Sequence, residues 1–209
     1  MLRSTRFWMA LATLLLAALY VLPLWHISLS APQYPEGLGM TIRIATIEGD
    51  TPYDLANINN LNHYIGMRPI VPGEIPEFRF MPWVLAALVG LGALSAILAR
   101  RGMIIGWLAG VAAFGVLGLA DFYRWGHDYG HNLDAETAII KIPGMSYQPP
   151  VIGTKEILNF TAQSWPDTGT WFALAAVVCG LIALFVSRQA APRRAAVGVR
   201  SVTPAAVRG

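Results

Sequence analysis

The chain has 209 residues, of which 55% are hydrophobic and only 13% are charged. Soluble domains carry roughly 25% charged residues, so this composition excludes a disordered chain and argues against an ordinary soluble enzyme. The formal net charge of +3 conceals an asymmetry, because all 12 acidic residues lie between Glu36 and Asp167. Most of the basic residues lie outside the acidic stretches, in three short arginine-rich segments.

Four apolar stretches are long enough to cross a bilayer, which needs roughly 20 apolar residues in a helix. They run from about 7 to 29, 82 to 98, 103 to 122 and 170 to 186, and none has a charge in its middle. The predicted domains are a transmembrane helix at 1–29, external loop 1 at 30–81, helices 2 and 3 at 82–122 with a turn at 99–102, external loop 2 at 123–169, helix 4 at 170–187 and a basic tail at 188–209.

The arginine-rich segments predict the orientation. They are the N-terminus, the turn at 99–102 and the C-terminal tail, and four spans place all three on one side with a charge of +9 and no acid. The two long loops then share the other side, with six basic and 12 acidic residues. Because positive segments stay inside, we expect a multi-pass protein of the bacterial inner membrane with both termini cytoplasmic. The first stretch loosely resembles a signal peptide, but it is too long, and an uncleaved anchor is preferred.

The two external loops are predicted to form a small mixed α/β cap on an otherwise all-α membrane protein. Residues 41–47 alternate between apolar and polar, which is typical of a strand. Residues 51–66 follow with a helical pattern that Thr51 or Asp54 can cap. In the second loop the third span continues to His131, but Gly126 and Gly130 argue against a stable helix there.

The first candidate site joins His63 and Met67, which share a face if they lie four residues apart on a helix. Imidazole and thioether are ligands suited to Cu(I), and Met40 and Met145 are external sulfurs that could complete the set. A pair of ligands is weak evidence, and the alternative is a polar helix with Met67 in a small core.

The second candidate joins His127 and His131, a spacing that chelates copper, zinc or nickel on a helix. Asp121 lies close by, at the end of the third span. A second use of the same region is a quinol pocket at the membrane face, in which Asp121 and His127 accept protons from the quinol hydroxyls. The alternative is an interfacial aromatic segment with solvated histidines.

Other chemistry is missing from the sequence. No phosphate loop, dinucleotide fingerprint, metalloprotease motif or Ser-His-Asp arrangement occurs, which disfavours a stand-alone enzyme. The one cysteine, Cys179, lies inside the fourth span, so no intramolecular disulfide forms, and no Cys-x-x-Cys-His binds covalent haem c. No external basic patch carries the aromatic residues that accompany nucleic-acid binding.

Two passages carry a family resemblance. The first contains Ala31-Pro-Gln-Tyr-Pro-Glu-Gly-Leu-Gly-Met40 and Ile58-Asn-Asn-Leu-Asn-His-Tyr-Ile-Gly-Met67, and the second contains Asp121-Phe-Tyr-Arg-Trp125 and Ile142-Pro-Gly-Met-Ser-Tyr-Gln-Pro-Pro150. Together they resemble small four-span bacterial membrane proteins associated with gene clusters for nitrous oxide reductase and its copper supply. The resemblance covers roughly 31–70 and 121–168.

Two functions remain open at this point. The resemblance implies an accessory protein whose periplasmic cap handles copper, or supports assembly of a periplasmic cuproenzyme such as nitrous oxide reductase. The alternative is a structural or electron-transfer subunit of a respiratory membrane complex, which docks a periplasmic redox protein or binds quinol at the outer face. Either role implies membrane lipid and other membrane subunits as partners.

Overall fold

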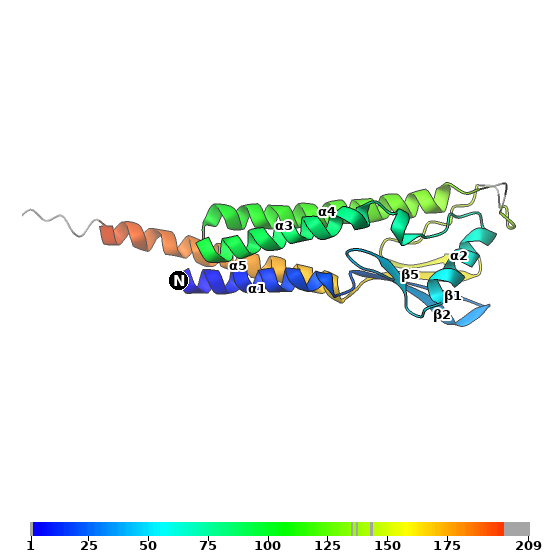
Figure 1. Cartoon of the computed structure of the whole chain (residues 1–209), viewed down its shortest axis with the longest axis horizontal. Coiled ribbons are helices and arrows are strands. Elements are labelled where there is room, and N and C mark those ends of the chain that lie inside the picture. Colours follow the sequence, from blue (N-terminus) through cyan, green and yellow to red (C-terminus); the bar gives the residue numbers. More distant parts are fainter. Residues whose placement is uncertain (1, 135, 137, 143, 199–209) are drawn as a thin grey trace, which may run out of the picture.

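The computed structural model describes residues 2–134, 136, 138–142 and 144–198. Long helices form a bundle at one end of the molecule, and a five-stranded sheet with a short helix lies at the other end (Figure 1). We call the sheet, helix α2 and their connecting segments the cap. The N-terminus and the end of helix α5 both lie at the end of the bundle away from the cap (Figure 1).

Within the described residues, four helices are long and apolar enough to cross a membrane. They occupy α1 (Leu2–Ala17), extended to Tyr20 by a short 3-10 helix (Ala18–Tyr20), α3 (Glu77–Leu98), α4 (Arg101–His131) and α5 (Thr168–Gly198). The three later spans fall on the predicted stretches, and each helix is longer than its stretch. The basic tail predicted for 188–209 lies partly outside the described residues, because the described chain ends at Gly198.

The first predicted span is wrong at its outer end. Helical structure stops at Tyr20, and Trp25–Ala31 forms strand β1 instead of continuing the helix to residue 29. Pro23 cannot donate a backbone hydrogen bond, which disfavours continuation of the helix. The residues after it alternate, with Trp25 and Ile27 buried and His26 and Ser28 less so. That period of two belongs to a strand, in which the polar residues His26, Ser28 and Ser30 alternate with apolar ones.

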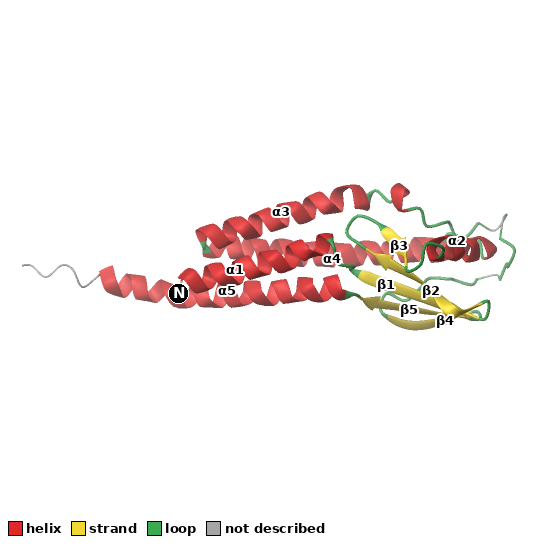
Figure 2. Cartoon of the chain, turned by 60° about the horizontal axis from the view of Figure 1, so that its bottom comes forward, coloured by secondary structure: helices red, strands yellow, loops and turns green. Residues whose placement is uncertain are grey.

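The sheet has the order β3-β2-β1-β5-β4, and all its pairs are antiparallel (Figure 2). Its strands after β1 are β2 (Tyr34–Ile42), β3 (Ile47–Gly49), β4 (Gly153–Ile157) and β5 (Phe160–Pro166). The single strand predicted at 41–47 is therefore wrong. Residues 43–46 make a turn closed by a 2.8 Å hydrogen bond from the N–H of Arg43 to the carbonyl of Thr46. The turn pairs Ile42 with Ile47 across a β2–β3 hairpin.

Helix α2 spans Asp54–Tyr64, inside the predicted 51–66. Neither predicted cap residue caps it, because the N-cap position is Tyr53, with no side-chain hydrogen bond. The hydroxyl of Thr51 instead donates to the carboxylate of Asp54, which also accepts a 2.9 Å hydrogen bond from the N–H of Gly39 in β2. Asp54 is buried, and its hydrogen bond with Gly39 connects α2 to strand β2 of the sheet. A second 3-10 helix (Pro72–Glu74) then leads toward α3.

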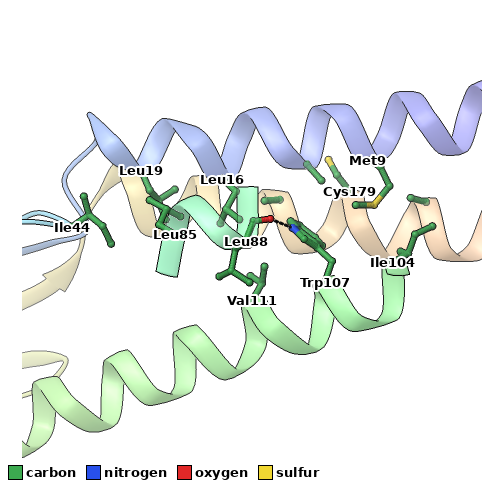
Figure 3. Close-up of a cluster of buried hydrophobic side chains, with 13 residues drawn as sticks. Met9, Leu16, Leu19, Ile44, Leu85, Leu88, Ile104, Trp107, Val111 and Cys179 are labelled. Atoms are coloured by element: carbon green, nitrogen blue, oxygen red, sulfur yellow. Dashed lines mark hydrogen bonds between the residues drawn. The ribbon is translucent and has the colours of Figure 1, made fainter. Parts of the chain in front are cut away.

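The bundle core surrounds Trp107 of α4, which is fully buried (Figure 3). Its indole N–H donates a 3.0 Å hydrogen bond to the carbonyl of Leu88 in α3. Two glycines make room for the ring, since a Cβ at Gly92 would lie 2.8 Å from the indole nitrogen and one at Gly180 would lie 2.7 Å from the ring. The small residues of α3 and α5 thus allow the large ring to sit between the helices.

Helix α4 continues past the bundle and runs beside the sheet in both views (Figures 1 and 2). The expectation that Gly126 and Gly130 interrupt it is wrong, because the helix is continuous to His131. Gly130 has a packing role instead: a Cβ there would lie 2.3 Å from the backbone nitrogen of Gln148, and its carbonyl accepts a 3.0 Å hydrogen bond from Tyr147. The close approach of residues 147–148 therefore requires glycine.

Candidate functional site

An apolar cavity of about 620 Å³ lies where the cap meets the bundle. Its walls are the inner face of the sheet, helix α2, the half of α4 nearer the cap, and the ends of α1, α3 and α5 that adjoin the cap. Trp25 and Met40 line it from the sheet, and Leu16 and Val177 line it from the bundle. The cavity therefore extends from the cap into the layer of apolar helices.

The cavity exists because α4 crosses the sheet with little contact. Phe122 of α4 reaches the sheet and packs on Trp25, with the ring centroids 5.4 Å apart. Along the same stretch α4 carries glycines at 115, 118 and 126, and a Cβ at any of them would meet no atom within 4 Å. Small residues at these positions leave open the space that larger side chains would fill.

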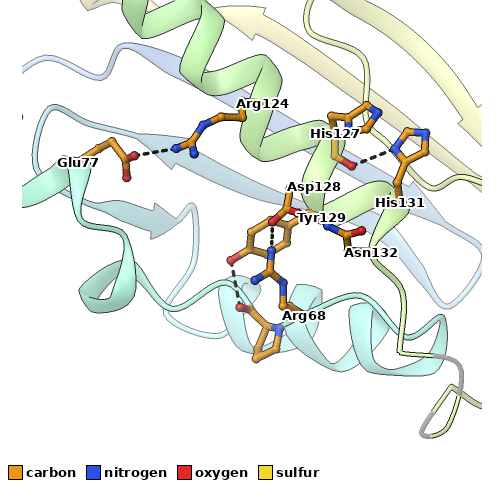
Figure 4. Close-up of polar contacts among 9 residues, drawn as sticks. Arg68, Glu77, Arg124, His127, Asp128, Tyr129, His131 and Asn132 are labelled. Atoms are coloured by element: carbon orange, nitrogen blue, oxygen red, sulfur yellow. Dashed lines mark hydrogen bonds and ion pairs between the residues drawn. The ribbon is translucent and has the colours of Figure 1, made fainter.

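A three-residue ion cluster borders the cavity where α3 and α4 approach the cap. The Nη2 of Arg124 lies 2.9 Å from Oε1 of Glu77 (Figure 4). The same nitrogen lies 2.8 Å from Oδ1 of Asp121. The two acids are largely covered, with side chains 14% and 25% exposed, whereas Arg124 is 64% exposed. Two carboxylates thus share one guanidinium, and both acids line the cavity.

Three buried side-chain atoms in the described part of the chain have no hydrogen-bond partner. They are Oε2 of Glu77, Nε1 of Trp125 and the hydroxyl oxygen of Tyr147. All three residues line the cavity. A buried polar group without a partner costs about 1–3 kcal/mol. The presence of three such groups on residues that line one cavity therefore requires an explanation.

A second polar cluster fixes the outer end of α4 to the cap. Arg68, just after α2, makes an ion pair with Asp128 of α4 (Figure 4). The guanidinium also lies 5.1 Å from the ring centroid of Tyr129, whose hydroxyl donates a 3.3 Å hydrogen bond to the carbonyl of Pro69. These contacts hold α4 over the cavity.

The first predicted ligand pair is not held on a helix. Helix α2 ends at Tyr64, and the N–H of Met67 bonds the carbonyl of Asn62 while that of Gly66 bonds the carbonyl of His63. Gly66 has a φ of 75°, so the chain leaves the helix in a Schellman motif. His63 is exposed, whereas Met67 and Met145 both pack against the apolar cluster that contains Tyr147.

Met40, the remaining predicted sulfur ligand, lies elsewhere. It is buried in the cluster of Trp25, Ile27 and Ile58, on the inner face of the sheet. The structure thus brings Met67 and Met145 into one cluster and leaves His63 and Met40 apart from it. Within the described residues, no group of three or more His, Cys, Asp or Glu side chains is placed to hold a metal ion.

His127 and His131 do lie on one helical face, as their spacing predicts. Their rings stack with centroids 4.0 Å apart and planes 15° from parallel, and both side chains are exposed. Nδ1 of His131 lies 2.9 Å from the carbonyl oxygen of His127 and donates to it (Figure 4). Nitrogen lone pairs lie in the ring plane, so stacked rings do not aim two of them at one ion. His127 does not line the cavity, whereas Asp121 does.

Glu77, Trp125 and Tyr147 were not predicted as site residues from the sequence. The register of two antiparallel helices could have predicted the position of Glu77. Because α3 and α4 are antiparallel and joined by a tight turn, equal rise per residue places the start of α3 level with residues near 121 of α4. Glu77 therefore had to lie beside Asp121. No comparable signal exists for Tyr147, whose place depends on a long irregular segment.

Comparison with known proteins leaves the family of the chain open. No protein-family model matches it, and no curated protein matches it either.

Proposed function

We propose that this protein is a multi-pass subunit of the bacterial inner membrane whose cap faces the periplasm and which binds an amphipathic membrane molecule in the cavity between cap and bundle. The observation that carries the proposal is the gathering of three unpartnered polar atoms around a cavity of about 620 Å³. Of the two functions expected from the sequence, this geometry favours the respiratory subunit that binds a membrane molecule at its outer face.

The orientation rests on charge. The start of α1 and the turn between α3 and α4 lie at the bundle end away from the cap (Figure 1), and these segments carry Arg3, Arg6, Arg100 and Arg101. The acidic residues belong to the cap and the helix ends beside it. Because positively charged segments are retained in the cytoplasm, the cap is placed outside. The cavity then lies at the outer surface of the membrane, where lipid-soluble molecules have access.

The size and lining of the cavity favour an apolar occupant. Binding pockets for small molecules have volumes of about 300–1,000 Å³, and this cavity falls within that range. Its apolar walls offer water few hydrogen bonds. A molecule with an apolar body and a polar head matches the apolar walls and the polar residues among them.

The test is to identify what copurifies with the full chain. Protein extracted from membranes in mild detergent is treated with organic solvent, and the extract is analysed by mass spectrometry. The matched variants are Gly118→Leu, which places a side chain into open space at the cavity wall, and Gly106→Leu, which does so on the same helix away from the cavity. Both remove a helical glycine, so neither substitution weakens the helix.

We expect one enriched amphipathic species in the wild type and in Gly106→Leu, and its depletion in Gly118→Leu. Equal amounts in all three proteins, or no enriched species in the wild type, would contradict the proposal. Copper handling, and with it the association with nitrous oxide reductase, stays a separate prediction because no described group of residues favours it over the cavity.

A further inference from the structure

We infer that the cavity binds the reduced, hydroxyl-bearing form of a membrane quinone, and that Glu77 accepts the hydrogen bond from its hydroxyl group. The inference rests on the proposed function, since it names the ligand class for the same cavity. It is carried by the identity of the three unpartnered atoms and by the charge around them.

The charge of the ion cluster excludes anionic headgroups. Glu77 and Asp121 share the single guanidinium of Arg124, which leaves one net negative charge beside the cavity. Oε1 of Glu77 is used by Arg124, and Oε2 is buried without a partner. A carboxylate or phosphate head would be repelled and would offer Oε2 no hydrogen. The occupant must therefore bring a donor to Glu77.

The other two unpartnered atoms exclude a cationic headgroup. The indole N–H of Trp125 can only donate, and the hydroxyl of Tyr147 both donates and accepts. An ammonium head would satisfy Glu77 but has no acceptor for Trp125. A hydroxyl group has one O–H donor and also acceptor lone pairs. A hydroxylated molecule can therefore donate to Glu77 and accept from Trp125 with one kind of group.

Aromatic side chains favour a ring as the carrier of these hydroxyl groups. The rings of Trp125 and Tyr129 on α4 contact each other in a tilted arrangement, with centroids 5.7 Å apart and planes at 49°, and both residues line the cavity. Phe78 of α3 and Phe122 of α4 add further ring surface. Aromatic rings pack on one another with offset or edge contacts that contribute beyond area burial. A quinol has oxygens on opposite edges of one ring, and so it presents separate groups to Glu77 and to Trp125.

The remaining part of the cavity suits an apolar tail. Beyond the ion cluster its walls are Leu16 of α1, Val111 and Phe114 of α4, and Ala173 and Val177 of α5. These belong to the apolar bundle, so a tail that leaves the ring in this direction enters surroundings like those of the lipid. The quinol geometry expected from the sequence thus keeps Asp121 at the site and replaces His127 by Glu77.

The experiment compares two forms of one molecule on the full chain. Protein freed of copurified ligand in detergent is titrated with a decyl-chain quinol, the matching oxidised quinone, decanoate and decylamine, each corrected for partition into empty micelles. The quinone lacks the hydroxyl hydrogens and differs little in size. Because a hydrogen bond to a charged group contributes about 1.5–3 kcal/mol, we expect the quinol to bind roughly tenfold more tightly or better.

Two variants distinguish the hydrogen bonds made to the ring oxygens from the apolar binding of the ring and tail. In Glu77→Gln the amide can donate to a quinone carbonyl, so we expect the preference for quinol to disappear. In Trp125→Phe the ring remains but the N–H is lost, so we expect both forms to weaken by a similar factor. Thermal unfolding of each variant establishes that it is folded before it is titrated.

The outcomes distinguish this inference from the proposed function. If the protein binds none of the four probes, both fail. If the fatty acid or the amine binds as well as the quinol, or if quinol and quinone bind equally to the wild type, the cavity still binds amphiphiles and only the quinol inference is overturned. A preference that persists unchanged in Glu77→Gln would remove Glu77 from the assigned role.

Discussion

Trp25 of β1 donates its indole N–H to the hydroxyl oxygen of Ser164 in β5, at 2.8 Å and across 139 residues of sequence. Ser164 is fully buried, and its own hydroxyl donates a 2.9 Å hydrogen bond to the carbonyl of Val151. One small side chain therefore connects the two central strands of the sheet to the segment that leads into β4. Its removal tests how far the cap depends on this connection.

Ser164→Ala leaves a buried N–H and a carbonyl without their partner. We expect a loss of about 2 kcal/mol, since each unsatisfied buried group costs roughly 1–3 kcal/mol. For a chain of this size that lowers Tm by roughly 4–8 °C. Scanning fluorimetry in detergent measures the change, with Ser30→Ala on an exposed position of β1 as the control. Equal Tm values for the two variants would show that the connection contributes nothing.

Arg124→Gln removes the cation shared by Glu77 and Asp121. The two largely covered carboxylates then repel each other, and we expect a lower Tm than in the wild type. The double variant Arg124→Gln/Glu77→Gln has only one charge left in the cluster and should recover part of the loss. Thermal unfolding of the four proteins of this cycle gives the coupling. A double variant no more stable than Arg124→Gln would contradict the shared-cation interpretation.

Asp54 makes the stability of the cap depend on pH. The hydrogen bond from the Thr51 hydroxyl lowers the pKa of Asp54, and the N–H of Gly39 acts in the same direction against the effect of burial. A carboxyl with a lowered folded-state pKa contributes stability above its ordinary value near pH 4 and loses it as the pH falls through the folded-state value. The stability of the folded protein should therefore decrease as the pH is lowered.

We expect Asp54→Asn to reduce this acid sensitivity, because the amide carries no charge to lose. The measurement is Tm against pH between about 3 and 7 for the wild type and the variant. Glu36→Gln is the matched control, since it removes an exposed carboxylate from β2 of the same sheet. Identical pH profiles for the wild type and Asp54→Asn would contradict the assigned role.

Gly66 is required at the end of α2 for two reasons that can be separated. It has a φ of 75°, and a Cβ there would lie 2.6 Å from the carbonyl oxygen of Asp134. Gly144 has the same φ but no atom within 4 Å of its Cβ position. Gly144→Ala should therefore cost only the left-handed strain of about 1 kcal/mol, and Gly66→Ala clearly more. Comparable Tm losses would rule out the steric part.

The copper hypothesis has its own test. It predicts that the wild type retains more Cu(I) in a titration than His63→Ala/Met67→Ala does, because imidazole and thioether are the proposed ligands. His127→Ala/His131→Ala tests the second pair under the same conditions. Equal retention in all three proteins would remove both candidate metal sites.

The sequence identifies the bundle well because hydrophobic length is a local property. The spans of α3, α4 and α5 follow from unbroken apolar runs, which any hydropathy average detects. The predicted end of the first span is misplaced because Trp25–Ala31 directly follows the apolar helix, and its apolar residues alternate with polar ones in a period of two. Average hydropathy cannot separate a membrane helix from a buried strand when one follows the other.

The site is less accessible to sequence reasoning because its parts come from distant segments. His63 and Met67 form a plausible pair only if α2 continues, and Gly66 ends it. Glu77 and Tyr147 are unremarkable singly, and become significant because α3, α4 and residues 147–148 meet around one cavity. Which polar atoms remain without partners is a property of the whole packing, and no local pattern encodes it.

The central ladder of the sheet determines the order in which the molecule can be assembled. Strand β1 pairs with β5, joining Trp25 to Pro166 and Ser30 to Thr161, so this ladder cannot form until β5 has been synthesised. In the orientation proposed above, β1 has an unpaired edge outside the membrane until β5 has been exported, which is a hazard for aggregation. Helix α5 directly follows β5, so in the proposed orientation the insertion of α5 into the membrane accompanies the closure of the sheet.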